Sequence, residues 1–298
     1  MSLRPSICCR VISVGLYLFA VQILQKNGKL NSKFVKLGIA ISLKMAKTKR
    51  NAPKTPKPVK SGPVKSAGKW KTKFSTIFSW AKKVLFIFFI GSIGLTLMYR
   101  FVDPFLTPLM MIRTFQQVFG PDKVRWKHDW VDMKEMSPFI PKATLAAEDQ
   151  KFFEHNGFDF DAMWTAFNRN QHSKKLRGGS TISQQTAKNV FLWPGRSYVR
   201  KVFEAYFTLL IELLWPKERI LEVYLNVIEM GRGVYGAEAA SRYYYGKSCR
   251  KLSKAEAAAI ASVFPLPLKW NPLHPSANLA RKQQWIRSQI DVMELPRF

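Results

Sequence analysis

The stretch Glu148-Asp149-Gln150-Lys151-Phe152-Phe153-Glu154-His155-Asn156-Gly157 holds three carboxylates and one histidine within ten residues. The alanine-rich segment 143–147 before it favours a helix, and a glycine such as Gly157 commonly follows the last turn of a helix. We therefore expect Glu148 to lie near the end of an amphipathic helix and to face a groove.

Two further polar blocks follow, namely Gly178-Gly179-Ser180-Thr181-Ile182-Ser183-Gln184-Gln185-Thr186-Ala187-Lys188-Asn189 and Arg200-Lys201-Val202-Phe203-Glu204. A single acidic pair such as Glu148-Asp149 is usually solvated helix surface. Three polar blocks in one order, each between apolar flanks, indicate a site instead. We predict that Glu148 and Glu204 share one groove.

The charge of the chain is unevenly distributed. Its 298 residues carry a net charge of +29, yet residues 1–102 contain 20 Lys and Arg and no acidic residue. Such a basic segment is typical of proteins that contact nucleic acid or an anionic membrane surface. The length allows one good-sized domain with appendages. The three cysteines, Cys8, Cys9 and Cys249, give neither a disulfide framework nor a metal-ligand spacing.

A run of 16 uncharged residues, 84–99, indicates a transmembrane helix. Trp80 and Lys83 before it and Arg100 after it suit the two membrane interfaces. A helix of this length spans about 24 Å, and its flanks extend it toward the roughly 30 Å of the hydrocarbon core. The alternative is a buried core helix. The basic residues before the run place the N-terminus in the cytoplasm and the following domain outside, which argues against nucleic acid.

These patterns divide the chain into four parts. Residues 1–45 form an N-terminal extension, which is either an upstream extension of the gene model or a further membrane-associated segment. Residues 46–79 are expected to be a basic, disordered cytoplasmic tail, and residues 80–102 to be the transmembrane helix. Residues 103–298 form the extracytoplasmic domain. Its first segment, 103–120, is apolar and fits either the membrane interface or the domain core.

The domain is predicted to be mainly α-helical, because the 3.6-residue period recurs and alternating strand patterns are scarce. Capping residues give the expected boundaries. Ser137 begins a helix that leads toward Glu148, whereas Asp161 and Ser180 cap the next two. The expected helices cover about 137–148, 161–170, 180–191, 198–215, 217–230 and 253–263.

Several motifs together resemble those of the peptidoglycan glycosyltransferase family. They are Glu148-Asp149-x-x-Phe152-x-x-His155-x-Gly157, the Gly-Gly-Ser-Thr-Ile-Ser-Gln-Gln of 178–185, Arg200-Lys201-x-x-Glu204, Lys217-Glu218-x-Ile220-Leu221-Glu222-x-Tyr224-Leu225-Asn226, Gly236-x-x-x-Ala240-x-x-Tyr243-x-x-Gly246-Lys247, and Asn271-Pro272. One such motif would be weak evidence, but their shared order is specific. They cover about residues 137–275, which is most of the domain.

The resemblance implies a lysozyme-like α fold and a glycosyltransferase. Its expected activity is polymerisation of lipid-linked disaccharide-pentapeptide (lipid II) into peptidoglycan glycan strands. The transfer would invert the sugar carbon, form β-1,4 bonds and release undecaprenyl diphosphate. Because no penicillin-binding module follows before Phe298, we expect a monofunctional enzyme anchored in the bacterial inner membrane.

Glu148 and Glu204 are the expected catalytic residues. The resemblance implies that Glu148 takes the proton from the 4-hydroxyl of the acceptor as that oxygen attacks C1 of the growing chain. The alternative is that Glu148 is a capped surface glutamate. Glu204 is expected on the donor side, on a bound cation or on the sugar-phosphate. No metal site is certain from the sequence, and Mg²⁺ or another divalent cation at Glu204 is the candidate cofactor.

A departing diphosphate is negatively charged, so cations should surround it. The resemblance assigns Lys188, Arg196 and Arg200 to this role, although Arg200 could also form a surface ion pair with Glu204. The segment 178–180 is expected to present free N–H groups at a helix N-terminus, which is a natural anion site. The expected substrate-binding residues are polar or basic and lie in or near the two later blocks: Ser180, Gln184, Gln185, Lys188, Asn189, Arg196, Arg200 and Lys201.

Four residues close to Glu148 are expected to support the site: Asp149, Phe152, His155 and Gly157. Asp149 should orient its neighbours, and Phe152 should lie in the core. His155 has no cysteine or second histidine nearby in the sequence, so it should hold the loop by hydrogen bonding rather than bind a metal. Cys249 is expected to be either a buried small side chain or a bystander thiol.

Two other functions are compatible with parts of the sequence. A lytic enzyme that cuts the same polymer would also use a glutamate, but it needs neither a cation cluster for diphosphate nor a membrane anchor. A non-enzymatic, membrane-tethered protein that binds anionic polymer would not depend on Glu148. The expected partners are lipid II, the growing glycan strand, the lipid bilayer, and other cell-wall synthases or divisome proteins. No nucleic acid is expected.

Overall fold

The computed structural model describes residues 68–121, 123–172, 178–195 and 197–296. Contacts divide the chain into two compact units, Met1–Lys69 and Trp70–Phe298. Apart from the first two residues of α3, every element described below belongs to the second unit. The predictions for residues 1–45 and for most of the tail 46–79 lie outside the described residues.

Helix α3 (Gly68–Tyr99) contains one candidate membrane span, Phe78–Tyr99, which is 22 residues long with a mean hydropathy of 1.7. At 1.5 Å per residue the span is about 33 Å long, close to the thickness of a hydrocarbon core. Its apolar side chains are largely exposed, with Phe86 at 67% and Ile87 at 69%. A core helix of a soluble domain would bury them, so the structure favours the membrane helix over the alternative of a core helix.

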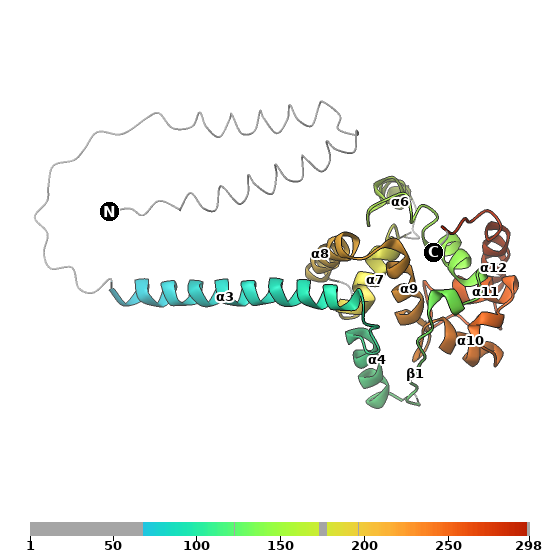
Figure 1. Cartoon of the computed structure of the whole chain (residues 1–298), viewed down its shortest axis with the longest axis horizontal. Helices are drawn as coiled ribbons and strands as arrows, with labels where there is room; N and C mark the ends of the chain where they lie inside the picture. Colours follow the sequence, from blue (N-terminus) through green and yellow to red (C-terminus); the bar gives the residue numbers. More distant parts are fainter. Residues whose placement is uncertain (1–67, 122, 173–177, 196, 297–298) are drawn as a thin grey trace, which may run out of the picture. The chain divides into compact units, whose positions relative to one another are not determined.

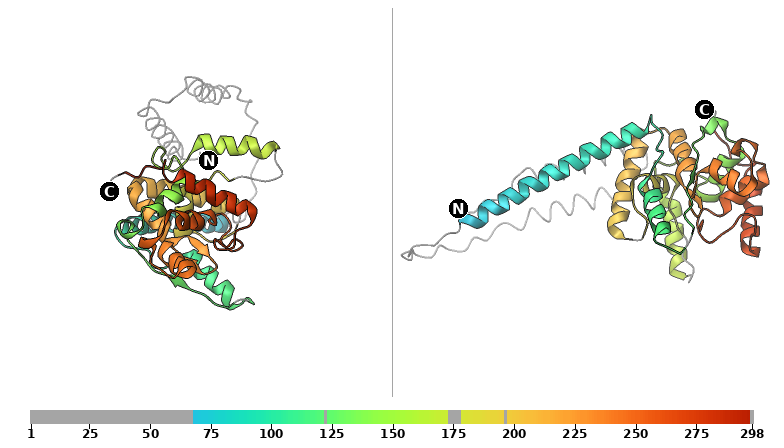
Figure 2. Two further views of the ribbon diagram at one scale, coloured as in Figure 1. Left: turned by 90° about the vertical axis from the view of Figure 1, so that its right-hand side faces the viewer. Right: turned by 90° about the horizontal axis from the view of Figure 1, so that it is seen from below.

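The domain after α3 is built mainly of helices, as predicted (Figure 1). The helices are α4 (Pro108–Val118), α5 (Phe139–Glu148), α6 (Phe160–His172), α7 (Ile182–Phe191), α8 (Tyr198–Leu214), α9 (Lys217–Val227), α10 (Ala237–Tyr245), α11 (Lys254–Ser262) and α12 (Ala277–Gln289), with 3₁₀ turns at Met133–Glu135 and Cys249–Lys251. Figure 1 and the left-hand view of Figure 2 show α4 and α6 at opposite edges of the domain.

The core is formed around α7, which packs against both α8 and α9, while α11 packs against α5 and α12. Each of these elements contributes fully buried side chains, such as Ile182 of α7, Tyr224 of α9 and Ile260 of α11. Because α7 is enclosed in this way, the polar side chains on its remaining surface have little freedom to move.

A small sheet joins the segment before α5 to the segment before α10. Its strands are β1 (Lys127–His128), β2 (Glu229–Gly231) and β3 (Val234–Tyr235), in the order β1-β3-β2. β3 pairs in parallel with β1 and antiparallel with β2. Strands of two or three residues are too short to show an alternating pattern, which is why the sequence did not predict them.

Two predicted helix caps are wrong by one or two residues. Thr181, not Ser180, caps α7, because its hydroxyl accepts from Gln184 N–H while the Gln184 side chain accepts from Thr181 N–H, which is a complete capping box. Asp159, not Asp161, caps α6 and accepts from Ala162 N–H at 2.8 Å. In both cases the capping side chain belongs to the residue just before the first helical residue.

Residues 103–120 were expected either at the membrane interface or in the domain core. Helix α4 has one face buried in the domain and another face that is exposed. Thr107 caps it and Pro108 occupies its first turn, where a proline is tolerated. Leu109 and Met110 are buried in the domain, whereas Phe115 is 64% exposed. The chain turns after α3, and α4 runs across the direction of α3 (Figure 1).

Two glycines at the ends of α10 give a matched stability test. Gly236 has φ 83° and a Cβ there would lie 2.5 Å from Asn226 O, whereas Gly246 has φ 67° with open space around it. We expect Gly246→Ala to cost about 1 kcal/mol from its backbone conformation alone, and Gly236→Ala to cost about 2–4 kcal/mol because the clash adds to the strain. Urea unfolding measures both, and equal losses would contradict the assigned clash.

Candidate active site

The site is built around Glu148, the last residue of α5. Its Oε2 accepts a hydrogen bond of 2.7 Å from the side-chain amide of Gln185 on α7. The oxygen of that same amide accepts from the hydroxyl of Tyr224 on α9 at 3.2 Å, and Tyr224 is fully buried. The Gln185 amide is therefore held from both ends and presents its NH₂ group to the carboxylate of Glu148.

The surroundings of Glu148 shift its acidity. Burial raises the pKa of its carboxyl group, and this shift is partly opposed by the hydrogen bond from Gln185 and by the charges of Lys282 and Lys188. A carboxyl group whose pKa is moved toward neutrality is better suited to accept and hold a proton than an ordinary surface glutamate. The alternative of a capped surface glutamate does not fit these contacts.

Lys188 of α7 is half-buried and makes no side-chain hydrogen bond or ion pair within the described residues. Burial lowers the pKa of its ammonium group, while the carboxylates of Glu204 and Glu148 favour the charged form. The two glutamates that the sequence predicted to share a groove therefore both act electrostatically on Lys188. Its ammonium group has hydrogen-bonding capacity to spare for an anion.

Glu204 of α8 is only 3% exposed and is paired with two cations on its own helix. Its Oε2 accepts from Arg200 at 2.7 Å, and its Oε1 is bonded to Lys201. Lys201 also donates to the hydroxyl of Ser180 at 3.4 Å. The ion pair of Arg200 and Glu204 is therefore real but is not a surface pair, because both side chains are largely buried.

Two cavities lie beside these residues. The first has a volume of about 310 Å³ and is lined by Gln185, Lys188, Asn189 and Arg200, with Arg113 and Glu229 among the other residues. The second, of about 420 Å³, is lined by Glu148 together with the segment 178–181. The hydrogen bond between Glu148 and Gln185 connects a residue of the second cavity with a residue of the first. Glu204 lines neither cavity, and both of its oxygens are bonded to Arg200 and Lys201. The prediction that Glu148 and Glu204 share one groove is therefore wrong for these two cavities.

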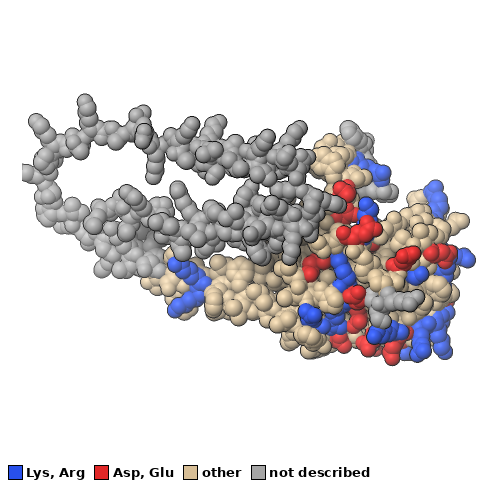
Figure 3. Space-filling model, turned by 45° about the horizontal axis from the view of Figure 1, so that its top comes forward, with Lys and Arg blue, Asp and Glu red and all other residues tan. Residues whose placement is uncertain are grey.

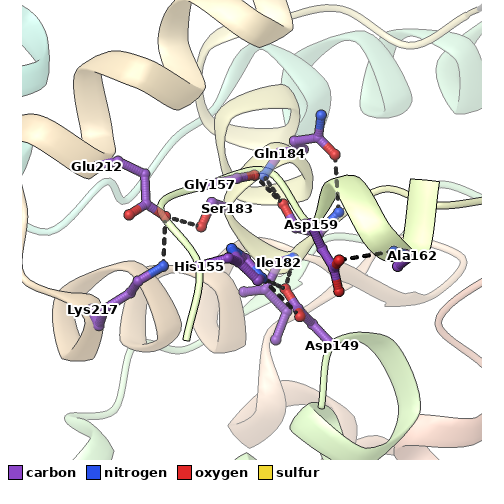
Figure 4. A network of polar contacts seen from close by, with 11 residues as sticks. Asp149, His155, Gly157, Asp159, Ala162, Ile182, Ser183, Gln184, Glu212 and Lys217 are labelled. Atoms are coloured by element: carbon purple, nitrogen blue, oxygen red, sulfur yellow. Dashed lines mark hydrogen bonds and ion pairs between the residues drawn. The ribbon is translucent and has the colours of Figure 1, made fainter. Parts of the chain in front are cut away.

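Asp149 ties the end of α5 to the start of α7 (Figure 4). Its carboxylate accepts from Ile182 N–H at 3.0 Å and is bonded to Nε2 of His155 at 3.0 Å. The prediction that His155 holds the loop by hydrogen bonding is confirmed. Two N–H groups at the start of α7 are occupied, because Asp149 takes that of Ile182 and the Thr181 hydroxyl takes that of Gln184. The predicted free N–H groups of the segment 178–180 stay a prediction.

A second set of contacts holds the other side of this junction (Figure 4). Thr181 donates its hydroxyl hydrogen to Gly157 O at 2.6 Å, and Ser183 is bonded to Glu212 of α8. Glu212 also pairs with Lys217 of α9 at 2.9 Å. Gly157 has φ 84°, and a Cβ there would lie 2.8 Å from a methyl group of Thr208, so this position requires glycine.

The remaining predicted residues fall into three groups. Phe152 and Cys249 are fully buried, as predicted, and burial raises the pKa of the Cys249 thiol, which makes it unreactive. Gln184 was predicted to bind substrate, but its amide belongs to the cap of α7. Arg196 lies outside the described residues. Within the described part of the chain, no group of three His, Cys, Asp or Glu side chains could hold a metal ion.

Three residues near the site were missed by the sequence reasoning. Arg113 and Glu229 line the first cavity and form an ion pair of 3.1 Å, and Lys282 of α12 acts on the charge of Glu148. Lys282 also donates to Ser262 O at 3.2 Å. No local signal marks them, because each meets the site through packing between elements that are distant in sequence.

Comparison with known proteins identifies the family to which this arrangement belongs. Residues 115–291 match the family model described as Transglycosylase. The chain belongs to the transglycosylase family. The resemblance inferred from the sequence motifs is therefore confirmed, and the protein is a glycosyltransferase with a mainly α-helical transglycosylase domain.

Individual relatives of this transglycosylase are similar over most of their length. A protein of Bacteroides thetaiotaomicron is 49% identical over 222 residues, which is 74% of this chain and 89% of the relative. One of Bdellovibrio bacteriovorus is 50% identical over 220 residues, 74% of this chain and 88% of the relative. One of Caulobacter vibrioides is 52% identical over 196 residues, 66% and 83% of the two chains. All three are named biosynthetic peptidoglycan transglycosylase.

The junction at Asp149 gives a stability prediction. Asp149→Ala removes two charge-assisted bonds and leaves the buried Ile182 N–H without an acceptor, so we expect a loss of about 3 kcal/mol in the free energy of unfolding. The control Asp159→Ala removes only the cap of α6 and should cost about 1 kcal/mol. Urea unfolding compares the two, and a loss for Asp149→Ala no larger than the control would contradict the assigned junction.

Proposed function

We propose that this transglycosylase polymerises lipid II, the lipid-linked disaccharide-pentapeptide, into the glycan strands of peptidoglycan. The observation that carries the proposal is the pairing of Glu148 with the first cavity through Gln185, while Lys188 and Arg200 line that cavity. Its relatives are named for the same biosynthetic activity.

The proposed reaction is one displacement with balanced proton transfer. The 4-hydroxyl oxygen of the acceptor attacks C1 of the growing chain, and its proton goes to Glu148. The bond from C1 to the diphosphate oxygen breaks, and the leaving undecaprenyl diphosphate keeps the electron pair. Because attack and departure occur on opposite faces, an α-linked donor gives a β-1,4 bond. Burial of Glu148 makes it a better proton acceptor near neutral pH.

The cations of the first cavity would stabilise the leaving group. Lys188 has no hydrogen-bond partner within the described residues, so its ammonium group is available for a diphosphate oxygen. Arg200 lines the same cavity with its guanidinium anchored on Glu204. A lytic enzyme that cuts the same polymer has no diphosphate to neutralise, so this pair of cations favours synthesis over cleavage.

For Glu204 we propose a role in fixing cations rather than in binding a metal. Both of its oxygens are already bonded, one to Arg200 and the other to Lys201. The residues described here therefore do not fit a dedicated metal site at Glu204. Mg²⁺ or another divalent cation would have to be held mainly by the diphosphate oxygens of the substrate.

The proposed location is the bacterial inner membrane, with α3 as a single span, the N-terminus in the cytoplasm and the domain in the periplasm. The 20 basic residues before position 103 support this orientation. On the face shown in Figure 3, basic and acidic side chains are interspersed over the domain. The expected partners remain the bilayer, lipid II, the glycan strand and other cell-wall synthases or divisome proteins.

The role of Glu148 is tested by Glu148→Gln in full-length protein given lipid II in detergent. Losing the base should lower the rate of glycan polymer formation by about 10²–10⁴-fold, while the thermal unfolding midpoint stays near that of the wild type. Glu154→Gln, an exposed glutamate six residues away, should polymerise normally. Polymer formed at the wild-type rate by Glu148→Gln would exclude Glu148 as the base of the reaction.

The hydrogen bond from Gln185 makes a prediction about pH. It stabilises the ionised form of Glu148, so removing it in Gln185→Leu should raise the pKa of Glu148 further. The base form of Glu148 is then lost at a higher pH, so the acidic limb of the pH–rate profile should move to higher pH. Gln284→Leu, at an exposed position, should leave the profile unchanged. An acidic limb that stays in place, or moves down, would contradict Glu148 as the titrating base.

A further inference from the structure

Arg219 of α9 donates hydrogen bonds to the end of the membrane helix, to the turn after it and to Glu222 on its own helix. Its Nη2 donates to Tyr99 O and to Val102 O at 3.0 Å each, and its Nε donates to Tyr99 O at 3.2 Å. Its Nη1 donates at 2.8 Å to Asp103 and at 2.8 Å to Glu222. An arginine has five N–H donors, so all of them have acceptors here.

The hydrogen bonds of Arg219 are made in a largely buried setting. Its side chain is 11% exposed, and its guanidinium carbon lies 5.3 Å from the centre of the Trp130 ring. The last carbonyl groups of a helix have no partner within the helix. Arg219 supplies that partner for Tyr99 and holds the turn that follows, so the domain itself caps the outer end of α3.

Three more hydrogen bonds join α3 to α8 and to the corner after it. Trp215 Nε1 donates to Thr96 O at 2.7 Å, and Arg100 Nη1 donates to Leu214 O at 2.7 Å. Further along α3, the hydroxyls of Ser92 and Tyr206 are 2.7 Å apart. Ser92 precedes the end of the helix by about 10 Å along its axis, so α8 contacts α3 within the candidate membrane span.

Helix α8 is also the helix that holds the cations of the active site. Arg200 and Lys201 lie near its beginning, and Trp215 follows its end. Its outward-facing residues Val202 and Leu213 are 70% and 76% exposed, as expected for a helix beside lipid. The position of the cations relative to the bilayer is therefore set by how α3 is joined to α8 and α9.

We propose that Arg219 is a positioning residue that locks the membrane helix to the catalytic domain and so fixes where the cations of α8 lie relative to that helix. The proposal rests on the proposed function, because it concerns a substrate whose prenyl chain lies in the bilayer. Arg219 does not line either cavity of the active site. Its replacement should therefore impair the use of membrane-embedded substrate without impairing the chemistry.

The test uses full-length Arg219→Gln with Arg242→Gln as the matched control. Arg242 also pairs with a glutamate on its own helix, Glu238, but belongs to α10, and its side chain is 60% exposed. Each protein is given long-chain lipid II in proteoliposomes and a short-chain, water-soluble analogue in detergent. Hydrogen exchange of the amides of residues 97–104 reports the end of α3 directly.

We expect Arg219→Gln to exchange faster than wild type over residues 97–104 and to polymerise long-chain substrate about tenfold more slowly in liposomes. Its rate with the short-chain analogue in detergent should stay within about twofold, and the control should match wild type in every assay. An equal loss with both substrates, or no loss with either, would overturn the proposal.

A milder variant covers the case in which Arg219→Gln does not fold. Asp103→Asn removes the charge of one acceptor in an exposed turn, and its carboxylate is 45% exposed. It should show a smaller loss with the same preference for the short-chain substrate, and a loss shared by both substrates would again overturn the proposal. Failure of the proposed function is a separate result, in which wild-type protein makes polymer from neither substrate.

Discussion

The proposed active site depends on the ammonium group of Lys188. This side chain is half-buried and has no hydrogen-bond or ion-pair partner within the described residues. Removing a cation from water is costly, and burial lowers the pKa of Lys188 accordingly. The cost is offset by two carboxylates, Glu204 and Glu148, which favour its charged form without being hydrogen-bonded to it. A charge held in this way can take an anionic ligand with little rearrangement, and this preorganisation is what a leaving diphosphate needs.

The polar groups close to Lys188 are hydrogen-bonded to one another. Asp149 and Thr181 use the N–H groups at the start of α7, and Gln185 is fixed between Tyr224 and Glu148. These contacts leave Lys188, together with Asn189, as side chains of α7 that line the first cavity beside Gln185. The orientation of α7 therefore selects which of its polar residues meets the substrate.

Local patterns in the sequence predicted the family and the mainly α-helical fold. They could not predict contacts between elements that are distant in the sequence. The order of the motifs gave the family, and helix periodicity gave the mainly α-helical fold. Histidine at 155 could be assigned a structural role from its type and neighbours. Gly157 was expected to end the helix, but α5 ends at Glu148, and Gly157 is required instead by its backbone conformation and its contact with Thr208. By contrast, the contacts of Arg113, Arg219 and Lys282 depend on how distant elements pack. Arg219 meets residues about 120 positions earlier, and no local pattern encodes such a pairing.

The central claim is that Lys188 is reserved for a diphosphate. The most direct measurement is the affinity of full-length protein for farnesyl diphosphate, compared by calorimetry between wild type and Lys188→Met at two salt concentrations. The account predicts binding at least about tenfold weaker in the variant, with a smaller dependence on salt. Equal affinity and equal salt dependence in the two proteins would contradict it.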